Sequence, residues 1–281
     1  MNDFPRKDRG CMNENVRVAL VQGKPYPDLD DPRNVGHAIR LLDYCRGKGV
    51  DIACLPACFP WSSEEALSEV ARSLQCYLVA GLLEVSGNKR FNTATLFDRR
   101  GQLVGRQRQV IVGAAERQHL AITPGEASYR AFDTDFGRVG LPVGIDFWGQ
   151  PDAARAMTEQ GADLIVNASI FPILLGHWKS AALTRALENF VPVVGINTAD
   201  FNLRLGGRVH HQHGGRSFII QPPRLVNKDD FRIWLRSLDI LEEWITLKLD
   251  KREQVALGEV DLRTAQRFRE EFRRQLGMQR P

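Results

Sequence analysis

The stretch RVGLPVGIDFW, residues 138–148, is a short apolar run that breaks off at Gly144 and Asp146. A helix is expected to follow, with Pro151 in its first turn. A strand, a sharp turn and a helix in this order raise one backbone position above the carboxyl edge of a sheet, where catalytic nucleophiles stand. The residue at the tip of this turn is Gly144, which has no side chain. The stretch therefore predicts a catalytic elbow that carries no nucleophile.

The same unit occurs once before in the chain. Arg17-Val18 is echoed by Arg138-Val139, and each half continues as strand, helix and strand, with a glycine that ends the helix. Four residues of the first half recur at one offset of 112 residues: Gly49, Asp51, Phe59 and Pro60 return as Gly161, Asp163, Phe171 and Pro172. We therefore expect an α/β fold with an internal pseudo-twofold repeat, in which two sheets face each other and helices cover the outside.

Composition is that of an ordinary globular protein. The 281 residues are 43% hydrophobic and 26% charged, and the formal net charge is only +4. This weak charge gives no reason to expect a nucleic-acid partner, and no apolar run is long enough to span a membrane. Residues 1–15 are polar and are expected to form a disordered leader, ahead of a single domain over residues 16–281.

The candidate metal ligands lack the spacing of a metal site. The five cysteines favour a reduced, cytoplasmic protein, since they are odd in number and scattered: Cys11, Cys45, Cys54, Cys58 and Cys76. His210, His211 and His213 fall in the polar, glycine-rich stretch 202–215, which we expect to be an irregular surface loop. No carboxylate or cysteine stands at ligand spacing from them, so the sequence predicts neither a metal nor a cofactor.

The C-terminal part predicts two helices around a strand. Residues 231–241 fit a helix, residues 244–247 would suit a strand, and the spacing of apolar residues from Ala265 to Leu276 marks an amphipathic terminal helix. Five arginines occupy its other face: Arg263, Arg267, Arg269, Arg273 and Arg274. We expect that face to meet solvent or a second subunit, because no aromatic platform for nucleic acid accompanies it.

A series of short motifs runs through the chain in a characteristic order. They are Gln22, Asn34, Gly49 to Pro56, Asn92-Thr93, Pro124-Gly125, Asp146, Gly161 to Asp163, His177-Trp178, Arg185 to Asn189, Asn197, Ser217 and Glu259 to Leu262. Over roughly residues 16 to 270, this ordered set resembles the nitrilase superfamily of carbon–nitrogen hydrolases. The resemblance implies a four-layer α-β-β-α sandwich that pairs with a second subunit.

The resemblance also implies three catalytic side chains. In the family a cysteine attacks the substrate carbon, a glutamate acts as general base and a lysine stabilises the tetrahedral intermediate. The glutamate position, after Leu55-Pro56, is Ala57, and the lysine position is Gln109. The cysteine position, two residues before Asp146, is Gly144. All three are missing while their flanks remain, which predicts a chain without carbon–nitrogen hydrolase activity.

Four neighbouring residues are candidates to line the former pocket. Cys58 follows Ala57, so strand alternation would turn its thiol to the opposite side, where it would serve packing. Glu116 corresponds to a second acidic residue of the family, unless Ala121 takes that place. Asp146 matches a family position. His177 is as well explained as a structural histidine, and Arg185 and Glu188 are expected to form an ion pair.

The leading prediction is thus a catalytically inactive member of the nitrilase superfamily with a regulatory or scaffolding role. We expect a cytoplasmic homodimer or larger even oligomer, without nucleic-acid or membrane partners. Two alternatives stay open. One is a small-molecule binding protein that uses the vestigial pocket. The other is an amide or nitrile hydrolase whose catalytic residues have moved to Cys58 or Asp146.

Overall fold

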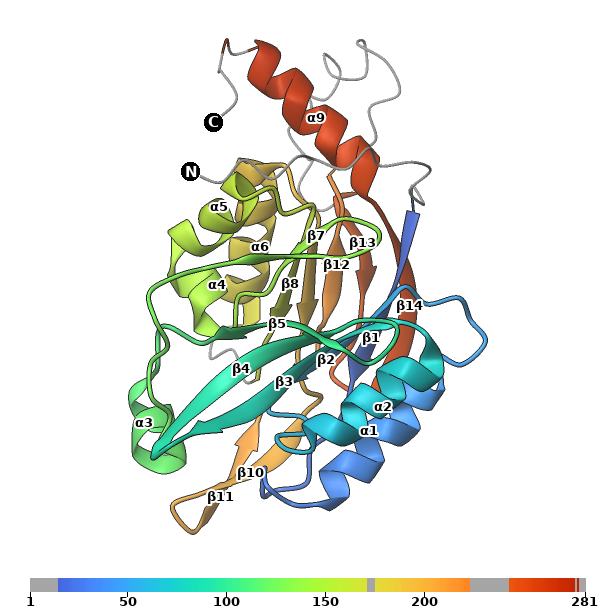
Figure 1. The fold of residues 1–281 in the computed structure, drawn as a ribbon. Coiled ribbons are helices and arrows are strands. Elements are labelled where there is room, and N and C mark those ends of the chain that lie inside the picture. Colours follow the sequence, from blue (N-terminus) through green and yellow to red (C-terminus); the bar gives the residue numbers. More distant parts are fainter. Residues whose placement is uncertain (1–14, 171–174, 223–242, 276, 278–281) are drawn as a thin grey trace.

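Two six-stranded sheets lie face to face in the computed structural model, which describes residues 15–170, 175–222, 243–275 and 277 (Figure 1). The first sheet has the order β14-β1-β2-β3-β4-β5, and the second has the order β13-β12-β9-β8-β7-β6. The strands of the first sheet are β1 (Asn15–Gln22), β2 (Ile52–Ala57), β3 (Tyr77–Ser86), β4 (Lys89–Phe97), β5 (Leu103–Arg108) and β14 (Gln254–Asp261). Those of the second are β6 (Ala131–Asp133), β7 (Arg138–Gly140), β8 (Leu164–Ala168), β9 (Val193–Ile196), β12 (Phe218–Ile220) and β13 (Ile245–Lys248).

Both sheets follow one pattern of strand directions. Three parallel strands form the centre of each, β1-β2-β3 in the first and β7-β8-β9 in the second. One edge of each sheet carries a single antiparallel strand, β14 or β6. The other edge carries two antiparallel strands, β4 and β5 or β12 and β13. The predicted internal repeat is confirmed.

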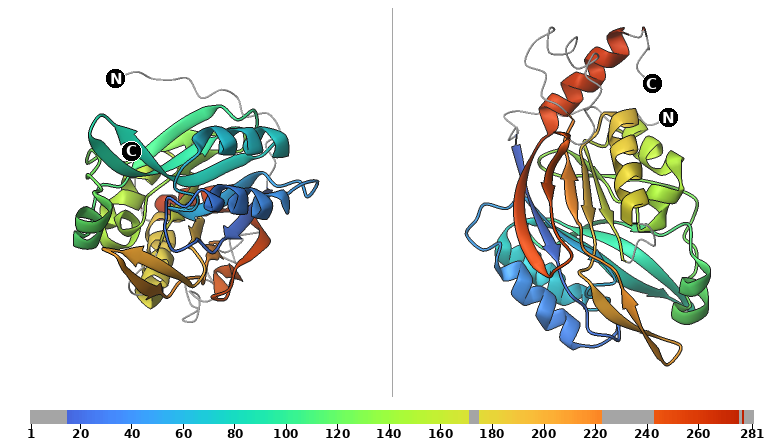
Figure 2. Two further views of the ribbon diagram at one scale, coloured as in Figure 1. Left: turned by 90° about the horizontal axis from the view of Figure 1, so that it is seen from below. Right: turned by 180° about the vertical axis from the view of Figure 1, so that it is seen from behind.

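Helices cover the outer face of each sheet, as the predicted four-layer sandwich requires (Figure 2). The first sheet is covered by α1 (Arg33–Asp43) and α2 (Glu64–Leu74). The second is covered by α4 (Ile145–Gly149), α5 (Pro151–Glu159) and α6 (Leu175–Asn189). In β1, Val18 and Leu20 join the core between the sheets, whereas Ala19 and Val21 pack toward α1 and α2. Such strands are buried on both faces, so they appear in the sequence as unbroken apolar runs.

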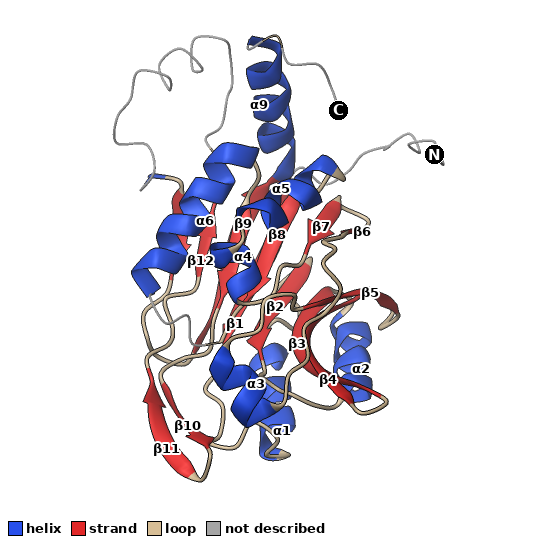
Figure 3. Cartoon of the chain, turned by 90° about the vertical axis from the view of Figure 1, so that its left-hand side faces the viewer, coloured by secondary structure: helices blue, strands red, loops and turns tan. Residues whose placement is uncertain are grey.

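A hairpin replaces the irregular loop expected over residues 202–215. Strands β10 (Phe201–Leu205) and β11 (Arg208–Gln212) pair antiparallel and extend away from the two sheets (Figure 3). Gly206 and Gly207 form its turn, with φ values of +54° and +76°, as a two-residue hairpin turn requires. The prediction was wrong because β11 is exposed along almost its whole length and shows no alternating apolar pattern, although β10 buries Phe201 and Leu203. The short helix α3 (Ala114–Leu120) lies at the same end of the molecule.

The C-terminal part follows the prediction with one correction. The strand expected near residues 244–247 is β13, while the helix expected over 231–241 lies outside the described residues, as does most of the leader. The terminal helix is α9 (Leu262–Gln275). Arg269 does not belong to its solvated face, because it is 8% exposed and donates a hydrogen bond to the carbonyl of Ala162. Among the described residues, no helix combines the length and apolar character needed to cross a bilayer.

Candidate functional site at the Gly144 elbow

The three predicted triad positions lie at one edge of the sandwich. Strand β5 runs in the same direction as β2 and β3, because two antiparallel pairings separate it from β3. Ala57 and Gln109 therefore stand at the same edge of the first sheet. The second sheet meets them at the end of β8: the N–H of Ala57 donates to the carbonyl of Ser169 at 3.2 Å, and the N–H of Gly144 to that of Ala168 at 2.8 Å.

The elbow has a strained backbone that favours glycine. Gly144 has φ +50° and ψ −124°, a region that side-chain-bearing residues avoid. Helix α4 begins directly after it, at Ile145, ahead of the expected helix α5 at Pro151. The sequence did not reveal α4, because five residues are too few to show a helical period. A β-carbon built on Gly144 would lie 3.9 Å from Nε2 of Gln109, so the Gln109 amide directly faces the empty elbow.

Gln109 uses its side-chain amide fully. Its Oε1 accepts a hydrogen bond from Nδ2 of Asn92 at 2.7 Å. Its Nε2 donates to the carbonyl of Ile111 at 2.7 Å and to the carboxylate of Glu116 at 3.1 Å. The side chain is 2% exposed. The predicted lysine position is thus occupied by a neutral amide whose oxygen and nitrogen are both hydrogen-bonded to protein.

Glu116 is the acidic neighbour of Gln109. Its carboxylate also accepts the N–H of Gly113 at 2.7 Å, at the start of α3. Burial raises the pKa of Glu116, and the hydrogen bonds from Gly113 and Gln109 oppose that rise. Ala121, the other candidate for the second acidic position, ends α3. Glu116 is thus the acidic residue beside Gln109, and its correspondence to the family's second acidic residue stays a prediction.

The thiol of Cys58 faces the hydrogen-bond network of Asn92 and Gln109. The prediction that it points to the opposite side of the strand is wrong. Strand β2 ends at Ala57, and Cys58 has φ +57°, so strand alternation no longer fixes its direction. Its Sγ lies 3.8 Å from Oδ1 of Asn92, and the residue is 2% exposed. Burial raises the pKa of the thiol well above its usual value, and the charge of Glu116 adds to the rise. The neutral thiol is a poor nucleophile.

Asp146 holds the segment after Gln109 against α4. It is fully buried, its Oδ1 accepts the N–H of Ile111 and its Oδ2 that of Val110, both at 2.7 Å. Burial raises its pKa to about 7, the two backbone N–H groups oppose the rise, and Glu116 adds to it. The carboxylate thus links α4 to the segment after β5, and both of its oxygens accept hydrogen bonds from the protein.

The remaining candidates lie on α6. His177 is exposed at the start of α6, where its ring meets the edge of Trp148 at a centroid distance of 5.6 Å. Its role in a ligand pocket stays a prediction. The expected ion pair between Arg185 and Glu188 is confirmed, at 3.1 Å.

The cations on β5 are also paired. Arg106 binds Glu64, and Arg108 binds Glu84 at 2.5 Å. The carboxylate of Glu84 is satisfied in the same pair, which lowers its pKa. Neither arginine therefore offers an unpaired charge beside the predicted lysine position.

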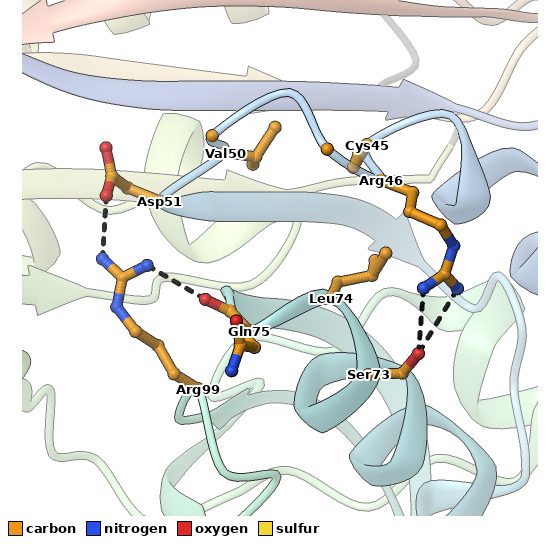
Figure 4. Close-up of a pocket in the computed structure, with 10 residues that line it drawn as sticks. Cys45, Arg46, Val50, Asp51, Ser73, Leu74, Gln75 and Arg99 are labelled. Carbon is orange, nitrogen blue, oxygen red and sulfur yellow. Dashed lines mark hydrogen bonds and ion pairs between the residues drawn. The ribbon is translucent and has the colours of Figure 1, made fainter.

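A hollow of about 390 Å³ lies at the opposite end of β2 and β3 (Figure 4). Its polar groups already bind one another: Arg46 donates to Oγ of Ser73 at 3.3 Å, and Arg99 to Oδ1 of Asp51 at 2.8 Å and to the carbonyl of Gln75 at 3.1 Å. Parallel sheets bind their ligands at the carboxyl ends of the strands. This hollow lies at the amino ends and is separate from the elbow.

The histidines of the hairpin do have a carboxylate nearby, contrary to the prediction. Folding brings Asp200 beside His211 and His213. Sequence spacing missed this carboxylate because it comes from the other strand of the hairpin.

Comparison with known proteins agrees with this architecture. Residues 17–270 match the family model described as carbon-nitrogen hydrolase. The chain is 27% identical to a nitrilase of Pyrococcus abyssi over 267 residues, which cover 88% of this chain and 90% of that one. It is 26% identical to the omega-amidase NIT2-B of Xenopus laevis over 268 residues, 86% and 93% of the two chains.

Solved structures show the same fold. The carbon-nitrogen hydrolase of Helicobacter pylori G27 superposes with a TM-score of 0.75 at 20% sequence identity, covering 94% of each chain. Two repeated sheets, an elbow between β7 and α4 and a family match over most of the sequence lead to one assignment. The chain belongs to the carbon–nitrogen hydrolase family, the nitrilase superfamily.

Proposed function

We propose that this chain has lost carbon–nitrogen hydrolase activity and acts as a regulatory or scaffolding protein. The observation that carries the proposal is the buried amide of Gln109, fully hydrogen-bonded in front of an elbow without a side chain. The family reaction needs a thiolate, a base and a positive charge that stabilises the developing oxyanion. Gly144, Ala57 and Gln109 supply none of them.

The size of the expected loss follows from how catalytic groups cooperate. Removing a whole catalytic set in a well-studied hydrolase costs about 10⁶-fold in turnover, and most of the loss appears when the nucleophile alone is removed. The missing nucleophile at Gly144 is therefore sufficient to silence the reaction. The absence of a carboxylate at Ala57 and an ammonium at Gln109 then leaves nothing to activate a substitute.

A relocated reaction centre is less well supported. Cys58 is the nearest thiol, but it is buried and its raised pKa keeps it protonated at neutral pH. Asp146 has both oxygens bound to backbone N–H groups, so it cannot attack a substrate without breaking these hydrogen bonds. Small-molecule binding at the former pocket would have to displace these internal contacts.

An assay against the activities of the relatives tests the proposal. The purified chain is incubated with an aliphatic nitrile and with an ω-amide, and ammonia release is measured. The Pyrococcus abyssi nitrilase and the Xenopus laevis omega-amidase are the respective positive controls. We expect no turnover above background. Clear turnover that disappears in Cys58→Ala would support the relocated centre and reject the proposal.

A regulatory or scaffolding role implies assembly, and we propose a symmetric homodimer or a larger even oligomer. The repeated sandwich presents the same surface patch on each copy, which suits an isologous interface. The free thiols of Cys45, Cys54, Cys58 and Cys76 agree with the proposed reducing, cytoplasmic compartment. Sedimentation at micromolar concentration should show the dimer, and a monomer would reject it.

A further inference from the structure

The base of the β10–β11 hairpin gathers one carboxylate and two imidazoles. Asp200, His211 and His213 each offer one ligand atom, and these atoms all lie within 4.8 Å of one another. The strand register explains this. Asn202 pairs with His211, so Asp200, two residues earlier, stands opposite His213. Residues two apart share a face of a strand, so all four side chains belong to one face of the ribbon.

Two hydrogen bonds orient the ligand atoms. Oδ1 of Asp200 accepts the N–H of Gly214 at 2.7 Å, which leaves Oδ2 on the side of His211. Nδ1 of His211 lies 3.2 Å from Oδ1 of Asn202. An amide oxygen only accepts, so Nδ1 carries the hydrogen and Nε2 presents its lone pair. Such outer contacts are the kind that fix the ligands of metal sites.

The separations suit an ion between the groups. Nε2 of His211 lies 4.0 Å from Oδ2 of Asp200, too long for a hydrogen bond. Bonds of about 2.0–2.1 Å to zinc place two tetrahedral ligands about 3.4 Å apart. The rings of His211 and His213 meet edge to face at a centroid distance of 4.8 Å, and both side chains are exposed. A small rotation of these side chains would therefore bring the ligand atoms to the spacing of a metal site.

The base of the hairpin is held firmly. The N–H of Asp200 donates to the carbonyl of Lys251 at 3.0 Å, and that of Gly215 to the carbonyl of Thr198 at 2.5 Å. A β-carbon on Gly214 would lie 2.3 Å from the Thr198 carbonyl oxygen, so the two chain segments touch. At the tip, a β-carbon on Gly206 would lie 3.5 Å from the ring of His119 in α3. The hairpin thus contacts the helix that carries Glu116.

We propose that Asp200, His211 and His213 bind a divalent transition-metal ion, with Zn²⁺ as the preferred ion. Two imidazoles and one carboxylate suit zinc and its neighbours better than the hard ions Mg²⁺ and Ca²⁺. Three protein ligands leave a fourth position for water. The proposal is independent of the state of the elbow, because none of these three residues belongs to the triad positions.

Titration of the chelator-treated full chain with Zn²⁺ tests the site, with Zn²⁺ binding measured by calorimetry. We expect one saturable ion per chain. His211→Ala and His213→Ala should each weaken binding by at least about tenfold. Asp200→Asn should weaken it too, while keeping an oxygen for the N–H of Gly214. His210→Ala is the matched control, because His210 lies on the same strand but on its opposite face. The Zn²⁺ affinity of this variant should be unchanged.

Cobalt supplies a second readout. Co²⁺ bound by nitrogen and oxygen should give only weak visible bands, whereas thiolate ligands add an intense near-ultraviolet band. The proposal is overturned if Zn²⁺ binding is absent, if His210→Ala weakens it as much as His211→Ala, or if the thiolate band appears. Circular dichroism confirms the fold of each variant. Because the two histidines are exposed, replacing them should leave the fold intact. Their variants therefore test Zn²⁺ binding even if Asp200→Asn disturbs the hairpin.

Discussion

Asn92 donates a 2.7 Å hydrogen bond from Nδ2 to Oε1 of Gln109, and both side chains are buried. A lysine at position 109 could not accept this hydrogen bond, because an ammonium group only donates. The amide of Gln109 is therefore matched to Asn92 as well as to Glu116. Position 109 is thus part of the packing at this end of β4 and β5, and this has measurable consequences.

Replacing Gln109 by leucine should lower the free energy of unfolding by about 1–3 kcal/mol, because Asn92 and Glu116 lose a buried partner. Urea denaturation measures the change. Gln102→Leu is the control, because Gln102 is exposed and uses only its backbone, so it should change stability by less than about 0.5 kcal/mol. Equal effects of the two substitutions would contradict the described network.

Gly144→Ala should destabilise the fold by about 1–3 kcal/mol through backbone strain alone, since φ is +50° and ψ −124° while the space beyond is open. The control is Gly36→Ala in α1, where a β-carbon meets only Arg40 at 3.6 Å. That change should stabilise the helix by up to about 1 kcal/mol. Thermal unfolding of both variants compares the two effects, and a Gly144→Ala as stable as wild type would contradict the assigned strain.

Hydrolase activity should return only when all three positions are restored together. Gly144→Cys alone places a thiol beside the neutral Gln109 amide, where nothing favours the thiolate, so its alkylation by iodoacetamide at neutral pH should be slow. Adding Ala57→Glu and Gln109→Lys supplies the base and the charge, and such groups act as a unit. The variants are compared in a Cys58→Ala background. Rapid alkylation of the single variant would show that another group still activates a nucleophile here.

Asp146→Asn should cost about 1–3 kcal/mol, because an asparagine can accept only one of the two backbone N–H groups and turns a donor toward the other. Asp152→Asn, at an exposed position in α5, is the control and should change stability by less than about 0.5 kcal/mol. Urea denaturation at pH 5 and pH 8 compares the variants.

The pH gives a second test of Asp146. Burial raises its pKa from 3.8 to about 7, so the native state holds the proton more tightly than the unfolded chain does. Its contribution to stability is present below pH 4 and is lost as the pH rises through 7, by up to about 1.4 kcal/mol per pH unit. The stability difference between wild type and Asp146→Asn should thus shrink from pH 5 to pH 8. A constant difference would mean that the two backbone N–H groups keep the pKa at its usual value.

Cys58 should react with iodoacetamide far more slowly in the native protein than in urea, since burial both blocks the thiol and raises its pKa. Peptide mass spectrometry after timed alkylation measures the rate at this residue. Cys45, whose pKa is raised to about 11 and which borders the open hollow, is an internal comparison and should react sooner. Fast native alkylation of Cys58 would favour the relocated reaction centre.

Several features of this protein could be predicted from its sequence alone. The strand–turn–helix pattern around Gly144 gave the elbow, the offset between Gly49 and Gly161 gave the repeat, and the order of short motifs gave the family. Each of these rests on residues that are close in sequence or on one constant spacing. Such local patterns predict structure because a few neighbouring residues determine both the backbone preference of a segment and the face that it buries.

Only the tertiary structure decided which side chains meet. Cys58 turned toward Asn92 because the strand ended one residue earlier, and Asp146 links two segments, 36 residues apart at Val110, because they meet at the elbow. The strand register of the hairpin places Asp200 beside His211 and His213. Arg269 was buried by packing against Ala162. These contacts depend on strand register, strand ends and helix docking, which the whole core sets together, so no short stretch of sequence contains them.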